Sequence, residues 1–375
     1  MVSGERLRTS AIDDRPPFRA EHVGSLLRPQ VLKDAFRGVE AGTIRADAFR
    51  EIRDRSIREA VALQEEVGLQ VVTDGEFCRG SWFLGFVNAV EGLTTRNAPF
   101  DFHGGGRSKF QAAYVEGKLR RVRGVTIDEF SYLRSITTRV PKITMPSPSL
   151  VHLLRGDVTV SRDAYPDLDE FWADLVAVYQ EELSELGRLG CAYVQLDEVP
   201  CAMLCDPRLR ASVQAAGQDP DELLDTYVSA ADRAIAERPP GMAIVMHLCR
   251  GNYKGQWMAE GGYEPVAERL FNGVAVDAFF LEYDTDRAGG FEPLRFVPPD
   301  KIVVLGLVST KTPELESATT LRRRIEEASR YVPLERLCLS PQCGFASSVG
   351  GNPLTTEDQR RKLALVVEVA AQVWG

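Results

Sequence analysis

The hydrophobic pattern of the chain is a series of short apolar runs separated by longer amphipathic segments. The runs are rich in Val, Ile and Leu, which is typical of parallel strands covered by helices on both faces. We therefore expect eight strands, at residues 18–25, 69–76, 142–149, 192–199, 243–252, 278–284, 301–308 and 336–345.

The segments between the runs predict helices, several of which open on Asp or Thr with acidic residues in the first turn, as helix starts prefer. We expect helices at residues 47–68, 167–190, 219–237, 312–332 and 355–375. This alternation predicts an α/β fold, a (β/α)8 TIM barrel, with residues 1–375 as a single catalytic domain. An open doubly wound sheet is the alternative, although no Gly-x-Gly-x-x-Gly motif follows the first predicted strand.

Residues 80–141 interrupt the alternation between the second and third predicted strands. The stretch "FDFHGGGRSKFQAAYVEGKLRRVRGVTI" reads as a hairpin punctuated by glycines, and a short helix follows near "FSYLRSIT". We expect residues 80–141 to form an inserted flap over one end of the barrel. Residues 1–17 are polar and predict a flexible N-terminal arm.

The composition narrows the class of protein. With 44% apolar and 26% charged residues, the chain is an ordinary soluble globular protein. Its formal net charge of -9 and lack of a Lys/Arg block disfavour nucleic acid as a partner. No apolar run is long enough to span a membrane, and no secretion signal opens the sequence. Seven cysteines in no regular framework predict reduced thiols and a cytoplasmic location.

Polar residues collect where the predicted strands end. In a barrel of this kind the carboxyl ends of all strands open onto one face, where active sites are built. The residues at these ends are His22, Gly24, Ser25, Asp74, Glu76, Gln195, Asp197, Glu198, His247, Cys249, Glu282, Asp284, Gln342 and Cys343.

Four of these residues, His247, Cys249, Glu282 and Cys343, could supply one nitrogen, one oxygen and two sulfurs. That donor set suits Zn²⁺ in a tetrahedral site. Strand alternation places residues 247 and 249 on the same face, so both can point inward. The alternative is that the two cysteines are small core residues, since free Cys is often buried. The nearby histidine and the carboxylate on a neighbouring strand favour the metal.

The other polar residues carry their own alternatives. Asp197 and Glu76 could cap the helices that follow their strands, and Asp74 could be either a ligand or a supporting residue. We expect structural roles for Cys78, Cys191, Cys201, Cys205 and Cys338, and no role in the site for His103 and His152.

Across nearly its whole length the sequence resembles the cobalamin-independent methionine synthase family, specifically its catalytic C-terminal barrel. The motifs that carry the resemblance, in this order, are "RAEHVGSLLRP" (19–29), "TDGEF" (73–77), "QLDEVPCA" (195–202), "MHLCRGN" (246–252), "LEYD" (281–284) and "SPQCGFASS" (340–348).

The resemblance implies specific roles for the residues at the strand ends. It implies that zinc is held by His247, Cys249, Glu282 and Cys343. It also implies that Gly24 and Ser25 lie near the carboxylate of the substrate, while Glu76 and Asp197 hold the amino group of homocysteine. The implied enzyme is a zinc-dependent S-methyltransferase, like the 5-methyltetrahydropteroyltri-L-glutamate–homocysteine S-methyltransferases, that converts homocysteine to methionine. Coordination would keep the substrate thiol as the nucleophilic thiolate.

The sequence also departs from the longer members of the family. It is too short to hold their N-terminal barrel, so a methylated folate and a methylcorrinoid both remain candidate donors, with a corrinoid or accessory protein as a candidate partner. His22 stands where the longer enzymes have an apolar residue, and we expect it and Asp74 to support the site. Self-association is a further expectation.

Two other functions stay open at this point. One is an epoxyalkane–coenzyme M transferase, which would alkylate a small thiol through the same kind of zinc site. The other is a non-catalytic structural zinc protein, because four protein ligands are typical of a closed site.

Overall fold

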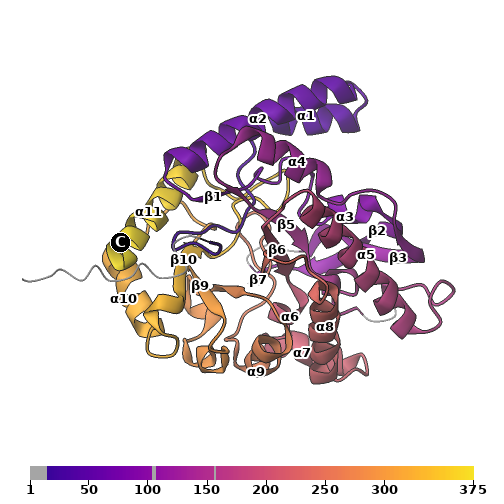
Figure 1. The fold of residues 1–375 in the computed structure, drawn as a ribbon. Coiled ribbons are helices and arrows are strands. Elements are labelled where there is room, and N and C mark those ends of the chain that lie inside the picture. Colours follow the sequence, from indigo (N-terminus) through magenta and orange to yellow (C-terminus); the bar gives the residue numbers. More distant parts are fainter. Residues whose placement is uncertain (1–14, 104–106, 156–157) are drawn as a thin grey trace, which may run out of the picture.

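The computed structural model describes residues 15–103, 107–155 and 158–375, and its centre is a parallel sheet ringed by helices (Figure 1). In the described residues, six strands are hydrogen-bonded in the order β10-β9-β8-β7-β6-β5, all parallel, and β1 pairs in parallel with β4. The strands are β1 (Val71–Val72), β2 (Val90–Asp101), β3 (Arg107–Arg121), β4 (Val140–Pro141), β5 (Ile143–Pro146), β6 (Tyr193–Glu198), β7 (Ala243–Leu248), β8 (Ala278–Glu282), β9 (Ile302–Val308) and β10 (Leu337–Pro341).

Helices follow most of the strands and cover the outside of the sheet (Figure 1). They are α1 (Gln30–Glu40), α2 (Ala46–Glu66), α3 (Leu84–Ala89), α4 (Ile127–Ile136), α5 (Leu168–Arg188), α6 (Pro200–Met203), α7 (Pro207–Ala215), α8 (Pro220–Ile235), α9 (Glu264–Gly273), α10 (Ala318–Ala328) and α11 (Thr356–Trp374). The architecture is therefore an α/β barrel of the TIM type, as the sequence predicts.

The first predicted strand is the main departure from regular geometry. Residues 18–25 run beside β10 but form a single bridge, between Ala20 and Leu339. The expectation of a regular strand there was wrong. The physical reason is that side chains bind part of this backbone in place of a strand ladder: the Val23 carbonyl accepts a hydrogen bond of 2.6 Å from the Gln195 side-chain amide.

The helices form where a polar cap precedes an apolar stripe. In α5 the Asp167 side chain accepts a hydrogen bond from the Asp169 backbone, which satisfies one free N–H of the first turn. Phe171, Leu175 and Tyr179 recur every four residues and are all fully buried against the sheet. Burying each such side chain contributes roughly 1.5–3 kcal/mol, so packing fixes the position of the helix.

The predicted helices differ from the observed ones mainly at their ends. The helix expected at residues 312–332 begins only at Ala318, because the Ser317 hydroxyl accepts from the Thr320 backbone and caps it there. The shorter helices α1, α3, α6, α7 and α9 were not predicted. In the described part of the chain, no helix has the length and hydropathy needed to span a membrane.

The insertion at residues 80–141 contains the antiparallel hairpin that the sequence predicts, formed by β2 and β3. Its described tip joins the barrel through the His103 N–H, which donates to the Trp257 carbonyl at 2.8 Å. Residues 104–106 of the turn, and residues 1–14 of the predicted N-terminal arm, lie outside the described residues. Whether the hairpin acts as a flap stays a prediction.

Candidate metal centre and adjoining cavity

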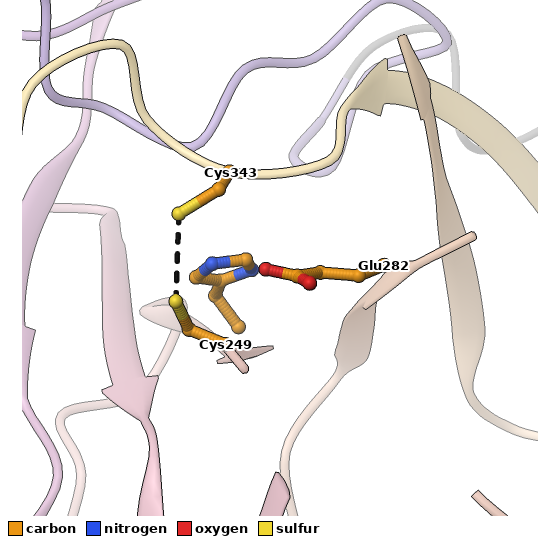
Figure 2. A group of neighbouring side chains, drawn as sticks. Cys249, Glu282 and Cys343 are labelled. Carbon is orange, nitrogen blue, oxygen red and sulfur yellow. Dashed lines mark hydrogen bonds between the residues drawn. The ribbon is translucent and has the colours of Figure 1, made fainter. Parts of the chain in front are cut away.

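The ends of three strands, β7, β8 and β10, bring together the four predicted metal ligands, with β9 lying between β8 and β10 in the sheet. His247 lies near the end of β7, Cys249 directly follows that strand, Glu282 ends β8, and Cys343 follows β10. One ligand atom from each of the four lies within 4.8 Å of every other. Figure 2 shows the sulfurs of Cys249 and Cys343 facing each other, with the Glu282 carboxylate reaching toward them from β8.

The chemistry of this cluster fits a soft divalent cation. The two sulfurs are 3.5 Å apart and share a hydrogen bond. Both ring nitrogens of His247 lack a hydrogen-bond partner, although the side chain is buried. Buried polar atoms are normally paired, so an imidazole with two free nitrogens beside two sulfurs marks a place for a bound group. Two sulfurs, one imidazole and one carboxylate are a donor set for Zn²⁺.

The electrostatics of the sulfur pair also favour a metal. The hydrogen bond between the Cys249 and Cys343 sulfurs, together with the adjacent His247, holds the pKa of Cys343 well below its usual range. The same hydrogen bond and burial raise the pKa of Cys249. Since the thiolate is the form that binds metal, this lowered pKa favours Cys343 as a metal ligand.

A cavity of about 210 Å³ opens directly onto this cluster. His247, Cys249 and Cys343 line it, whereas Glu282 is fully buried and is not among the described lining residues. The same cavity is lined by three of the four residues predicted to bind substrate, Ser25, Glu76 and Asp197.

The two carboxylates are buried and incompletely paired. Glu76 accepts a hydrogen bond of 2.9 Å from the Thr144 hydroxyl through Oε1, while its Oε2 has no partner. Asp197 accepts through Oδ1 from the Gln195 amide at 2.7 Å. Burial and the nearby charge of Glu76 raise the pKa of Asp197 to about 7. A cation bound between the two carboxylates would stabilise their charged forms and so lower the pKa of Asp197 again.

Asp74 acts on Glu76 through the backbone. Glu76 has a φ of 63°, a left-handed conformation that non-glycine residues rarely adopt. The Asp74 side chain accepts from the Glu76 N–H at 2.8 Å, and the Arg28 guanidinium donates to the Glu76 carbonyl at 2.8 Å. These contacts hold Glu76 toward the cavity. Asp74 itself is not among the described residues that line it.

Gly24 shapes the wall beside Glu76 without lining the cavity. Its φ is +134°, and a Cβ there would meet Thr144 Cγ2 at 2.7 Å. We expect Gly24→Ala to lower the free energy of unfolding by roughly 2–3 kcal/mol, because strain and a steric contact add. The control is Gly42→Ala, at φ +70° with no neighbour within 4 Å, which should cost only about 1 kcal/mol. Urea titration of both variants measures the difference, and equal losses would contradict the steric explanation.

The remaining histidines do not reach the cavity. His22 is buried with both ring nitrogens unpaired, and burial lowers its pKa well below the usual range. It is not among the described cavity-lining residues, so its predicted support for the site is not direct. His152 bonds Tyr227 at 2.6 Å, and His103 lies 3.6 Å from Glu260.

A second group of ionisable side chains lies outside this cavity. Asp74, Cys78 and Glu129 come within 4.8 Å of one another, and Arg79 lies 3.8 Å from Glu129. Burial, only partly offset by Arg79, raises the pKa of Glu129 to about 8.

The stability of the protein should therefore depend on Glu129 and on pH. Because the folded state keeps the proton that the unfolded chain releases, the contribution of Glu129 to stability is present below about pH 4.5 and is lost as the pH rises through about 8. We expect Glu129→Gln to match the parent near pH 4 and to exceed its free energy of unfolding by up to about 5 kcal/mol at pH 9, at about 1.4 kcal/mol for each pH unit between about 4.5 and about 8. Denaturant titrations across this range, with the exposed Glu326→Gln as control, test this. A constant difference at all pH values would refute it.

Sequence reasoning missed the aromatic part of the cavity wall. Trp82, Phe83, Phe102 and Tyr253 line it, from the loop before α3, the hairpin and the loop after β7. No sequence signal identifies them, because loop aromatics have no periodicity and only the fold brings them together.

Comparison with known proteins agrees with this geometry. Residues 20–372 match the family model described as the catalytic domain of the cobalamin-independent synthase. The uncharacterized protein YxjG of Bacillus subtilis is 42% identical over 365 residues, which is 96% of each chain. A methionine synthase of Pyrococcus furiosus is 26% identical over 329 residues, 86% of this chain and 85% of its own. A structure from Listeria monocytogenes, described as a candidate vitamin-B12-independent methionine synthase, superposes with a TM-score of 0.76 at 34% identity, covering 96% of this chain and 99% of that one.

Proposed function

This chain belongs to the cobalamin-independent synthase catalytic-domain family, a family of methyltransferases, and we propose that it is a zinc-dependent enzyme that methylates homocysteine to give methionine. One observation carries the proposal. A single cavity is lined by three candidate zinc ligands and by a pair of buried carboxylates, so it can hold a thiol and an ammonium group at the same time.

We assign the metal to His247, Cys249, Glu282 and Cys343, whose clustering and unpaired nitrogens support this choice. When bound, zinc would keep the thiol of the substrate in its nucleophilic thiolate form.

The protein side chains would fix the rest of the substrate. Glu76 and Asp197 would pair with the ammonium group of homocysteine, and Ser25 would lie beside its carboxylate. Both carboxylates are buried and held by hydrogen bonds, so their side chains lose little conformational entropy when the substrate binds. This positioning orients the sulfur before methyl transfer, which contributes to rate through proximity.

The same observations disfavour the two alternative functions. An epoxyalkane–coenzyme M transferase would have to accept a sulfonate, which Glu76 and Asp197 would repel. A structural zinc site is closed by protein on all sides, whereas three of the four candidate ligands here line an open cavity.

The position of the hairpin supports a role for it as a flap. Phe102 and Gln111 belong to the hairpin and line the cavity. We therefore propose that the inserted segment covers the bound substrate, as many catalytic lids do.

Zinc-edge X-ray absorption with and without homocysteine tests the proposed function. We expect the zinc-loaded protein to gain one sulfur neighbour when homocysteine is added. An unchanged coordination shell would contradict the proposal and would indicate a structural zinc or another thiol, of which coenzyme M would be tried next.

A further inference from the structure

We propose that Lys311 is a further positioning residue of this site, whose buried ammonium group favours the thiolate form of the substrate. The inference rests on the proposed function, because it concerns the step in which the thiol loses its proton and binds at the candidate metal centre. Three observations carry it: the place of Lys311 in the barrel, its lack of a carboxylate partner among the described residues, and the balance of charges around the centre.

The barrel places Lys311 behind the candidate metal ligands. It follows β9, which lies between β8 and β10, two strands whose ends carry candidate ligands. The preceding residue, Thr310, is tied to both neighbours of Cys343. Its N–H donates to the Gln342 side chain at 2.7 Å, and its hydroxyl donates to the Gly344 carbonyl at 3.0 Å. These bonds fix the loop from which the lysine side chain projects.

The ammonium group of Lys311 reaches the cavity wall from behind. Its Nζ lies 3.4 Å from the Gly251 carbonyl and 3.4 Å from the side-chain oxygen of Asn252, and both of these residues line the cavity. Lys311 itself is buried and is not among the described lining residues. Its charge is close enough to act on three of the four candidate ligands, which are Cys249, Glu282 and Cys343.

The ammonium group has no charge partner in the described part of the chain. Its two acceptors there are neutral amide oxygens, and no described carboxylate forms an ion pair with Lys311. Burying a charge without an opposite charge nearby is costly, so buried charges in proteins are normally paired or lie beside a metal. The partner of Lys311 is therefore to be found in the metal centre and in what binds there.

The other charges around the centre already offset one another. The two positive charges of a bound zinc would be met by the two cysteine thiolates. Arg287 lies 2.8 Å from Asp284 and 3.4 Å from Glu282. Arg250, which donates to the Glu282 carbonyl at 3.3 Å, supplies a second positive charge for these two carboxylates. This leaves the charge of Lys311 for the incoming thiolate.

The charges on the far side of the cavity do not alter this balance. Glu76 lies 3.8 Å from Arg79, which offsets part of its charge before any substrate binds. Burial and the nearby Glu76 raise the pKa of Asp197 to about 7, so Asp197 is only partly charged near neutral pH until the substrate ammonium group arrives. These groups act on the amino-acid part of the substrate, whereas Lys311 acts on its sulfur.

The step that Lys311 assists is the loss of a proton from the thiol. The S–H bond of homocysteine breaks, the proton passes to solvent, and the sulfur keeps the electron pair with which it binds. A fixed positive charge nearby favours the charged product of this step. At the effective dielectric constant of about 20 that suits protein sites, one such charge changes the equilibrium roughly 10- to 100-fold.

The ratio of the affinities for homocysteine and for methionine isolates this effect. Methionine carries the same ammonium and carboxylate groups, but its sulfur is a neutral thioether. In calorimetric titrations of the zinc-loaded protein at pH 7, we expect this ratio to fall roughly 10- to 100-fold in Lys311→Gln and Lys311→Met, and to be kept in Lys311→Arg. The pH at which homocysteine binding is half-maximal should rise by about one to two units in the neutral variants, because one pH unit offsets a tenfold cost of releasing the proton.

The matched control is Lys301→Met. Lys301 is also buried and donates to carbonyls, those of Val274 and Val276, but it precedes β9 instead of following it and so lies at the other end of the barrel. Its ratio should equal that of the parent.

An unchanged ratio in both neutral variants would overturn the inference. An equal fall in Lys311→Arg or in Lys301→Met would also overturn it, because hydrogen bonding or packing would then explain the loss. If zinc in the parent protein gains a sulfur neighbour from homocysteine but the ratio does not fall in the neutral variants, the inference fails and the proposed function stands. If zinc in the parent gains no sulfur neighbour, both fail.

Discussion

Replacing Cys343 with serine should remove the metal and the activity together. Cys343 has its pKa held below the usual range by Cys249 and His247, so it is the sulfur best prepared to bind metal as a thiolate. A serine hydroxyl at this position stays protonated and is a poor zinc ligand. Zinc sites of four protein ligands bind with about 10–16 kcal/mol, so losing one of four removes roughly 3 kcal/mol, more than a hundredfold in affinity.

The measurement is the zinc content of purified protein after dialysis, followed by methionine formation on the same samples. Cys249→Ser should behave like Cys343→Ser, because the two sulfurs are 3.5 Å apart and belong to the same cluster. The matched control is Cys191→Ser, which is also buried but lies outside the cluster, where its sulfur faces the Tyr193 carbonyl at 3.6 Å. It should keep a full complement of zinc. Stoichiometric metal in either ligand variant would show that the ligand set is wrong.

The candidate metal cluster could be predicted from the sequence because of one property of parallel barrels. Residues that end different strands become neighbours whatever their separation in the chain, so His247 and Cys343 could be placed together from the strand pattern alone. The same reasoning placed Glu76 and Asp197 in one cavity. His247 and Asp197 lie near the ends of β7 and β6, and Cys343 and Glu76 follow β10 and β1.

Other features could not be predicted, because they depend on contacts between loops. The rare backbone conformation of Glu76 is held by Asp74 and Arg28, and no local pattern specifies such a combination. The first predicted strand has the right apolar pattern, but hydrogen bonds from distant side chains replaced its ladder. The aromatic wall combines three separate loops, so it emerges only from the folded chain.

Removing one of the cavity carboxylates should change which thiols the protein accepts. Asp197→Asn and Glu76→Gln each replace a charged partner of the ammonium group with a neutral amide of nearly the same shape. A hydrogen bond to a charged group contributes about 1.5–3 kcal/mol, so we expect each variant to bind homocysteine roughly 10- to 100-fold more weakly. Affinity for 4-mercaptobutanoate, which lacks only the amino group, should stay constant or rise, because repulsion between its carboxylate and the cavity is reduced.

Calorimetric titration of the zinc-loaded protein with both thiols separates the loss of an ion pair from general damage to the site. Damage to the metal centre would weaken both thiols equally, since both bind through sulfur. Loss of the ammonium partner weakens homocysteine alone, and the ratio of the two affinities isolates that contribution. The exposed Glu326→Gln, on α10, should leave both affinities and their ratio unchanged. If the ratio is also unchanged in Asp197→Asn and Glu76→Gln, the carboxylates do not recognise the ammonium group, and the choice of an amino-acid thiol over a sulfonated one loses its physical basis.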